Sequence, residues 1–243
     1  SRRPCCQNRT VRPRLLLLAL ALLLGATAGH SQWLETKVIL PDSLGGAIWP
    51  SCLTTDTSER YVYIGDKGSC VQGGGIYVVD AEALSRVARI PAGYVSSVCT
   101  NTRRNKVYAA DSAGNRVLVI SCVTNQVVAT IPTAKPAALC YNSVDDKVCV
   151  ASYVYGEPGS LSAIDCSSDS VVATMHFGEG EPSLCYNPVG NRVFCWTYDT
   201  LLVMDGASDS VVATYPGAWE EPMVVNPVSN KVYAWHRGSG VLA

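Results

Sequence analysis

Ten residues offer side chains that could bind or transform a ligand, and they lie in short segments between apolar runs. Four are aromatic, five are glutamates and one is a lysine. They are Tyr94, Lys135, Tyr153, Tyr155, Glu157, Glu179, Glu181, Trp219, Glu220 and Glu221. Aromatic rings beside carboxylates on connecting segments are typical of binding surfaces. Each residue also has a purely structural interpretation, since a loop carboxylate is usually only solvated.

The sequence carries little else that suggests catalysis. Two glutamate pairs, Glu179 with Glu181 and Glu220 with Glu221, have the side chains for calcium binding or acid–base chemistry. Neither pair has the dense aspartate spacing of a calcium loop. The chain has three histidines, too few for a site built from several imidazoles. It contains no nucleophile-elbow, metalloprotease or nucleotide-binding motif. We therefore assign no catalytic residue, no metal site and no cofactor.

Three short sequence motifs, which we call phrases, recur in a fixed order along the chain. They indicate the structural unit that positions the candidate residues. The first is a Tyr-Asn-x-Val-x-Asn-Lys/Arg-Val type of phrase at 141–148, 186–193 and 225–232, with a looser copy at 100–107. Their final valines are 41, 45 and 39 residues apart along the chain. A second phrase ends in Asp at 76–80, 161–165 and 202–205, and a third, Ser-Asp-Ser-Val-Val-Ala-Thr, is identical at 168–174 and 208–214. This order indicates one structural unit repeated about every 40 residues.

Each unit predicts four short strands, which we call a, b, c and d. Asn-Pro-Val-x-Asn forms the a–b turn, and the Asp that ends strand c begins the c–d turn. One such sheet cannot cover both of its faces, whereas sheets stacked around an axis can. The fold class is therefore all-β: a β-propeller of four-stranded antiparallel blades. A β-solenoid is the alternative, but its repeats are usually about half as long or less.

The phrases resemble those of the YVTN-repeat, or YncE-like, propellers, a family of secreted and surface-layer proteins. The matching residues are 105–110, 115–120 and 125–132, with counterparts at 146–174 and 191–216. The resemblance covers about residues 33–243. It implies a propeller, typically of seven blades, without an enzymatic motif shared by all members.

The number of blades stays open. Residues 36–41 fit the strand d phrase and could complete the last blade, which gives about five blades in all. The alternative is that the chain is part of a longer, seven-bladed ring, because residues 240–243 only begin a strand c.

Residues 1–28 predict a signal peptide, which leaves 29–243 as the propeller domain. Five arginines precede an apolar run at 15–24, and Ala26-Thr27-Ala28 offers a cleavage site. The run is shorter than the roughly 20 residues that span a bilayer, so the mature chain is expected to lack a membrane span. The protein is thus expected to be exported to the periplasm, the extracellular space or the cell surface. Cleavage leaves 14 basic and 20 acidic residues, which argues against a nucleic-acid partner.

Nine cysteines follow the signal peptide. Cys52, Cys99, Cys140 and Cys185 recur in strand a, which we expect to line the inner ring. Equivalent positions in neighbouring blades are expected to lie too far apart for a disulfide. These thiols are interpreted as small apolar packing residues, with scattered disulfides as the alternative. No C-x-x-C spacing suggests a metal cluster.

The topology predicts where the candidate residues gather. In an antiparallel meander, successive connections alternate between two ends of the sheet, so the d–a and b–c connections share one face. All ten candidates fall on that face, whereas the a–b and c–d turns are regular and suit a structural role. The sequence therefore favours a non-catalytic extracytoplasmic binding module with an unknown protein or glycan ligand. A propeller enzyme (lyase, lactonase-like hydrolase or quinoprotein-like oxidoreductase) and a surface-layer or adhesin component are the alternatives.

Overall fold

The computed structural model describes residues 49–68, 73–217, 219–236 and 240–242. These residues form nineteen strands and no helix, as the turn-rich, strand-rich sequence predicts. The predicted signal peptide at 1–28 and the strand expected at 36–41 lie outside the described residues.

The first two sheets contain four antiparallel strands each, in sequence order. Their strands are β1 (Pro50–Thr55), β2 (Tyr61–Asp66), β3 (Gly75–Asp80) and β4 (Ser85–Pro91), then β5 (Val95–Asn101), β6 (Lys106–Asp111), β7 (Arg116–Ser121) and β8 (Gln126–Pro132). These strands correspond one by one to the predicted a, b, c and d.

The next two sheets repeat this order, and the fifth has three described strands. Their strands are β9 (Pro136–Asn142), β10 (Lys147–Ser152), β11 (Gly159–Asp165), β12 (Ser170–Phe177), β13 (Ser183–Asn187), β14 (Arg192–Trp196), β15 (Thr200–Asp205), β16 (Ser210–Pro216), β17 (Trp219–Asn226), β18 (Lys231–His236) and β19 (Gly240–Leu242). We call each sheet a blade and number the blades 1 to 5. The expectation of four-stranded antiparallel blades, about five in number, is confirmed.

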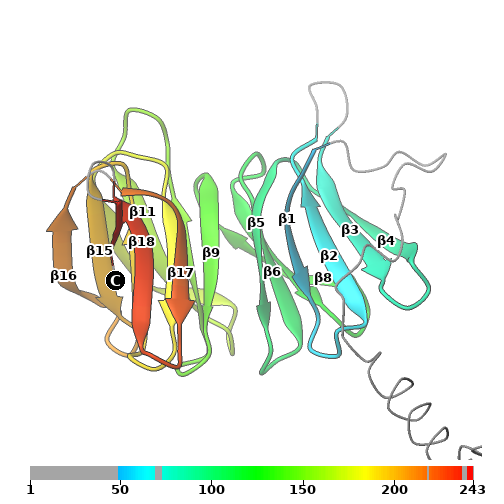
Figure 1. Cartoon of the computed structure of the whole chain (residues 1–243). Coiled ribbons are helices and arrows are strands. Elements are labelled where there is room, and N and C mark those ends of the chain that lie inside the picture. Colours follow the sequence, from blue (N-terminus) through cyan, green and yellow to red (C-terminus); the bar gives the residue numbers. More distant parts are fainter. Residues whose placement is uncertain (1–48, 69–72, 218, 237–239, 243) are drawn as a thin grey trace, which may run out of the picture. The chain divides into compact units, whose positions relative to one another are not determined.

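Neighbouring blades pack through their first strands, so β1 contacts β5, β5 contacts β9, β9 contacts β13, and β13 contacts β17. In Figure 1 these first strands lie toward the middle, whereas β4 and β16 lie at the outer edges. Most residues of the fourth strands β8, β12 and β16 are exposed, and only a few are half-buried or buried. Strand a is therefore the inner strand, as predicted, and the blades form an open series among the described residues.

The hydrophobic core lies between the blades rather than within one of them. In β6, Val107 packs with Tyr63 of blade 1, whereas the next residue, Tyr108, packs with Val148 of blade 3. Because successive side chains of a strand point to opposite faces, one strand supplies two separate core layers. This explains why the middle strands are apolar at nearly every position.

The repeated turn phrase has a similar geometry in each blade where it occurs. The first Asn accepts hydrogen bonds at its side-chain oxygen from the backbone two and three residues on, at 3.0 Å each for Asn142 with Val144 and Asp145. The turn ends on a residue in the left-handed region, such as Asp146 with a φ of 55°. Asp165 accepts the same pair of bonds in its c–d turn, at 2.8 and 2.9 Å from Ser167 and Ser168. These aspartates are turn-formers, as the sequence indicates.

The structure holds the described cysteines in the reduced form, and five of them are buried: Cys122, Cys140, Cys149, Cys166 and Cys195. Each buried one belongs to a hydrophobic layer between blades. Their interpretation as packing residues is therefore confirmed for these five, whereas Cys52, Cys99 and Cys185 are half-buried and Cys70 lies outside the described residues.

Candidate ligand-binding site

The d–a and b–c connections lie at the same end of the blades, which we call the connection face. Backbone hydrogen bonds join them: Ser112 donates to Tyr94 at 2.8 Å, and Tyr153 donates to Lys135 at 3.2 Å. In each pair, the residue after strand b meets the residue before strand a of the same blade. The predicted sharing of one face is thus confirmed where these bonds occur.

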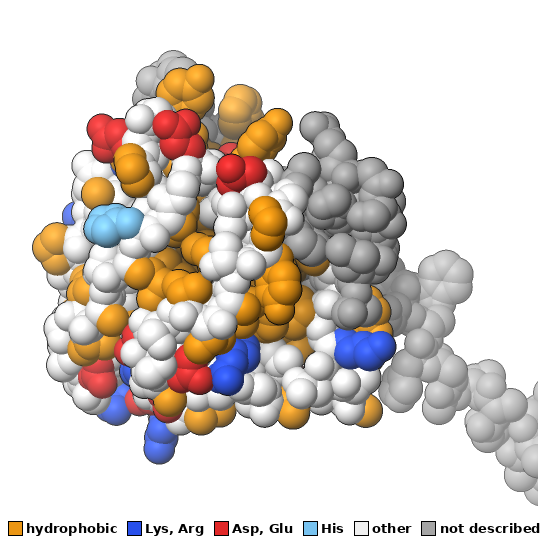
Figure 2. Space-filling model, turned by 90° about the vertical axis from the view of Figure 1, so that its left-hand side faces the viewer, with side chains coloured by type: hydrophobic (Ala, Val, Ile, Leu, Met, Phe, Trp, Pro, Cys, Tyr) orange, Lys and Arg blue, Asp and Glu red, His pale blue; other side chains and the backbone are white. Residues whose placement is uncertain are grey.

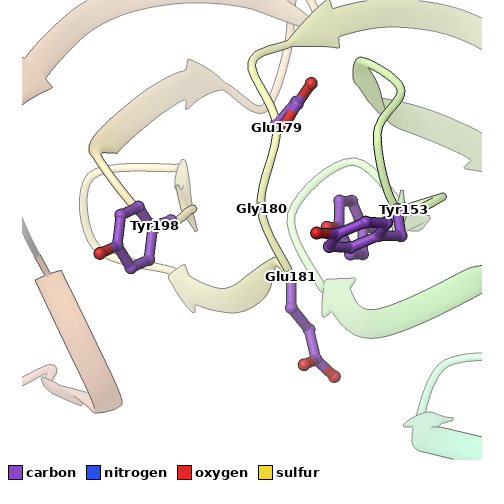
Figure 3. Close-up of a pocket in the computed structure, with 6 residues that line it drawn as sticks. Tyr153, Glu179, Gly180, Glu181 and Tyr198 are labelled. Atoms are coloured by element: carbon purple, nitrogen blue, oxygen red, sulfur yellow. The ribbon is translucent and has the colours of Figure 1, made fainter.

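A pocket of about 380 Å³ opens on this face between blades 3 and 4. Six residues from three connections line it: Tyr153, Tyr155, Glu179, Gly180, Glu181 and Tyr198. In Figure 3, Tyr153 and Tyr198 lie on either side of the segment 179–181. Figure 2 shows the upper end of the molecule with acidic side chains among hydrophobic ones, whereas lysines and arginines gather toward the lower end.

Gly180 lets the segment 178–182 pass close to the β14–β15 connection. A Cβ on this glycine would lie 2.7 Å from the backbone nitrogen of Tyr198, and its φ of 131° is one that other residues rarely adopt. In an extended strand, the side chains of two residues that flank a third point to the same side. The φ of Gly180 interrupts such an extended backbone. The side chains of Glu179 and Glu181 instead point away from each other (Figure 3).

A buried aromatic ring lies beside the connection that carries two of the pocket tyrosines. Phe177 ends β12 and is 8% exposed, and a Cβ on Gly159 would collide with its ring at 1.9 Å. Only glycine at position 159 therefore allows β11 to begin against this ring. The ring thus packs against the start of β11, directly after the connection that carries Tyr153 and Tyr155.

Two tyrosines of the pocket are unusually open to solvent. Tyr155 is 91% exposed and Tyr198 is 68% exposed. Neither ring packs in a hydrophobic layer between blades. Glu179 and Glu181 form no hydrogen bond or ion pair shorter than 4 Å within the described part of the chain. Rings and carboxylates that are not used by the fold remain available to a ligand.

Glu181 also lies within electrostatic reach of Lys67, a lysine that contacts the predicted residue Tyr94. The ammonium of Lys67 sits 5.1 Å from the centre of the Tyr94 ring. The pKa of Lys67 is raised, chiefly by its interaction with Tyr94 and further by the carboxylate of Glu181, although burial opposes the rise. Lys67, which follows β2 of blade 1, and Tyr94, which precedes β5 of blade 2, therefore present a positive charge beside a ring within electrostatic reach of Glu181.

Two predicted residues stand apart from the pocket. Glu157 is exposed and closes a turn in its connection by donating its N–H to Val154 at 3.1 Å. Lys135 is exposed with a φ of 41°, and its N–H donates to the Asn115 side chain at 3.1 Å. The backbone of Lys135 thus supports the connections, while its side chain does not line the pocket.

The placement of Trp219, Glu220 and Glu221 in a connection is wrong. All three belong to β17, which pairs Trp219 with His236 and Glu220 with Trp235. The pairing then shifts its register between Glu220 and Val224. This irregularity accommodates Pro222, which has no N–H to donate to the neighbouring strand. The strand was not predicted from the sequence because Pro222 lies within it, and a proline usually marks a connection or the start of a strand.

The sequence reasoning missed Tyr198. It follows Thr197, which is buried directly after the second strand of blade 4, much as Tyr153 follows buried Ser152 at the end of the second strand of blade 3. The equivalence of these positions in the repeat was the available signal. The connection that carries Tyr198 is short and contains no repeated phrase, so the sequence did not single out this tyrosine.

The described residues offer neither a metal-binding cluster nor a membrane-spanning helix. No group of three or more His, Cys, Asp or Glu side chains is placed to hold a metal ion among them. Within the same ranges, no helix is long and apolar enough to cross a membrane.

Comparisons with known proteins agree on the architecture. The structure is similar to hydrazine synthase from Kuenenia stuttgartiensis, with a TM-score of 0.67, 14% identity and coverage of 85% of this chain and 60% of that one. It is also similar to a functionally unknown protein from Desulfotomaculum acetoxidans, with a TM-score of 0.61, 10% identity and coverage of 88% and 76%. The fold is that of a β-propeller.

The likeness to these propellers shows the fold alone, because both identities are low. No family model matches the chain, and no curated protein matches it in sequence. The chain spans about 60% of the length of the hydrazine synthase chain.

Proposed function

We propose that this propeller is a non-catalytic extracytoplasmic binding module whose ligand occupies the pocket on the connection face. One observation carries the proposal. Three tyrosines and two glutamates come from three separate connections to line one pocket, and no hydrogen bond or ion pair among the described residues uses their hydroxyl or carboxylate groups. Its volume of about 380 Å³ falls within the range of small-ligand pockets, roughly 300–1,000 Å³.

The chemistry of the lining suits a ligand with an apolar face and hydrogen-bond donors. Tyrosine rings provide flat apolar area, and carboxylates accept hydrogen bonds from hydroxyl or amino groups. A glycan offers this combination in each sugar ring, and a partner protein offers it through its side chains. The glycan is the first ligand to test, because the pocket is small and open.

The test is a binding screen followed by matched substitutions. Soluble oligosaccharides from bacterial, plant and animal polysaccharides are arrayed, and the strongest binder is titrated by calorimetry. Tyr198→Ala should weaken its affinity at least about tenfold, or about 1.4 kcal/mol. Tyr215→Ala is the control, because Tyr215 is 52% exposed on β16 and does not line the pocket.

Both variants should keep the wild-type melting temperature within a few degrees, since each ring is largely exposed. Equal affinity of Tyr198→Ala and wild type would refute the placement of the site. A panel without a binder would exclude these sugars, and the same two variants would then be compared for capture of a protein partner by cross-linking.

The enzyme alternative is less well supported. A pair of carboxylates that shares one substrate should converge on it, whereas Glu179 and Glu181 point apart (Figure 3). The structural alternative, a surface-layer or adhesin component, is compatible with the same fold. Such a component would function by assembling with other protein molecules rather than by binding a soluble ligand.

Membership of the YVTN-repeat family and export are part of this proposal. The repeated phrases at 100–107, 141–148 and 186–193 support the family, and the arginine-rich and apolar segments within residues 1–28 support export. N-terminal sequencing of the protein recovered from an exporting host should begin at Gly29. A protein that retains residues 1–28 inside the cell would contradict the export.

A further inference from the structure

Two cysteines of blade 3 face each other across neighbouring strands. Cys140 of β9 is the direct partner of Cys149 of β10 in the antiparallel ladder. Side chains of directly opposed residues lie on the same side of the sheet. Both thiols belong to the hydrophobic layer between blades 3 and 4, which confirms that they share one face.

The distance between such partners suits a disulfide. Directly opposed residues of an antiparallel pair have their Cα atoms about 4.5 or 5.5 Å apart. A disulfide requires Cα atoms about 4.4–6.8 Å apart. The backbone of blade 3 can therefore accept the bond without a large movement.

The other described strand cysteines have no such partner. Cys52 pairs with Gly65, Cys99 with Tyr108, and Cys185 with Phe194. Cys195 is opposed by Leu184 on one side and Leu202 on the other. Within the described ladders, Cys140 and Cys149 form the one pair of directly opposed cysteines.

We infer that Cys140 and Cys149 are a disulfide site that is oxidised while the protein folds in an oxidising compartment. A thiolate of the pair attacks a small disulfide such as glutathione disulfide, forms a mixed disulfide and releases one glutathione thiolate. The second cysteine attacks the protein sulfur of this mixed disulfide and releases the other glutathione. Two protein thiols are oxidised, one glutathione disulfide is reduced to two glutathiones, and the two thiol protons pass to them.

Burial decides when this reaction can occur. Cys140 is 9% exposed and Cys149 is 1% exposed in the folded protein. The pKa of Cys140 is well above the ordinary value, first through its hydrogen bonding with Cys149 and then through burial. A thiolate is therefore scarce once blade 4 covers the pair, so exchange is expected before that layer closes.

The disulfide would cross-link two strands of the blade that carries Tyr153 and Tyr155 of the pocket. It would join the inner strand of blade 3 to β10, and β10 ends at Ser152, next to Tyr153. The disulfide site itself does not depend on the pocket having a ligand.

Peptide mapping tests the inference. The full chain is refolded from the reduced, denatured state in a glutathione buffer, alkylated and digested with trypsin. Cleavage after Lys147 separates the two cysteines, so the disulfide should link peptide 117–147 to peptide 148–192 with a mass 2 Da below their sum. Because these peptides also contain Cys122, Cys166 and Cys185, the link is assigned by fragmentation and by variants.

The variants give opposite expected results. The link should vanish in Cys140→Ala and in Cys149→Ala, and it should persist in Cys185→Ala, which removes a strand cysteine opposed by Phe194. No link after refolding of the wild type, or a link of equal amount in Cys149→Ala, would overturn the inference. The folded, reduced protein should acquire the link at least about tenfold more slowly than the refolding chain. Equal rates would overturn the role given to burial.

Discussion

Leu84 occupies a backbone position that asparagine or aspartate fills elsewhere in the chain. It ends the β3–β4 turn with a φ of 52°, where the corresponding turns end in Asn125, Asp169 and Asp209 with φ values of 55°, 51° and 53°. The left-handed conformation costs residues with a Cβ about 1–2 kcal/mol, and asparagine and aspartate tolerate it best. The Leu84 side chain is also 46% exposed, so little burial compensates for this strain.

Replacing this leucine should stabilise the protein. Leu84→Asn is expected to raise the free energy of unfolding by about 1 kcal/mol, measured by urea denaturation. Leu84→Ala is the matched control, because alanine also removes the exposed side chain but keeps the strained left-handed Cβ. An equal gain in both variants would show that the apolar surface, and not the backbone conformation, limits stability here.

At the scale of the strand, adjacent blades are joined by a repeated ion pair. Lys106 of blade 2 meets Asp169 of blade 3 at 2.7 Å, and Lys147 of blade 3 meets Asp209 of blade 4 at 2.6 Å. The hydroxyl of Tyr108 also donates to Asp169 at 2.6 Å. Blade 3 has Cys149 at the position equivalent to Tyr108, and the second carboxylate oxygen of Asp209 is buried without a described hydrogen-bond partner.

This difference predicts unequal effects for two equivalent substitutions. Lys147→Met should leave the partly buried Asp209 carboxylate without a charged or hydroxyl donor and cost about 1–3 kcal/mol. Lys106→Met should cost less, because Tyr108 still donates to Asp169. Thermal unfolding followed by circular dichroism compares the two. A larger loss in Lys106→Met would contradict this account of the Asp209 environment.

The repeat made the blades predictable, whereas the connections were only partly so. Strand order, the inner position of strand a and the turn-forming aspartates follow from phrases that recur with a similar geometry. The b–c connections have no common phrase: in blade 2 it is a four-residue turn at 112–115 in which Asp111 accepts the N–H of Gly114 at 3.0 Å, and in blade 3 it spans 153–158. Pocket residues such as Tyr198 depend on how connections of two blades approach each other, which no single phrase encodes.

For the molecule as a whole, the loss of stability in acid is expected to arise in the turns of the face opposite the connections, where the described aspartates with a lowered pKa lie. The pKa of Asp80 is lowered, chiefly by the N–H of Ala83, and that of Asp205 by the N–H of Ser208. Hydrogen bonds from Ser167 and Ser168 lower the pKa of Asp165 to about 2. Burial acts to raise the pKa of Asp146, but hydrogen bonds from Asn101, Arg104 and Tyr141 outweigh it and lower the value.

These shifts predict how stability depends on pH. A carboxylate with a lower pKa in the folded than in the unfolded state contributes stability above its unfolded pKa, near 4, and loses it as the pH falls through the folded value. The contribution of these four aspartates to the melting temperature should therefore stay constant from pH 7 to about pH 5 and decline between about pH 4 and pH 2.

Asp165→Asn provides the comparison, because an amide oxygen can still accept the two backbone N–H bonds but carries no charge to titrate. Melting curves of both proteins across this range measure the difference. The variant should melt below wild type at pH 7, and the gap should close toward pH 2 as Asp165 is protonated in the wild type. A gap that stays constant with pH would mean that the charge of this carboxylate does not stabilise the turn.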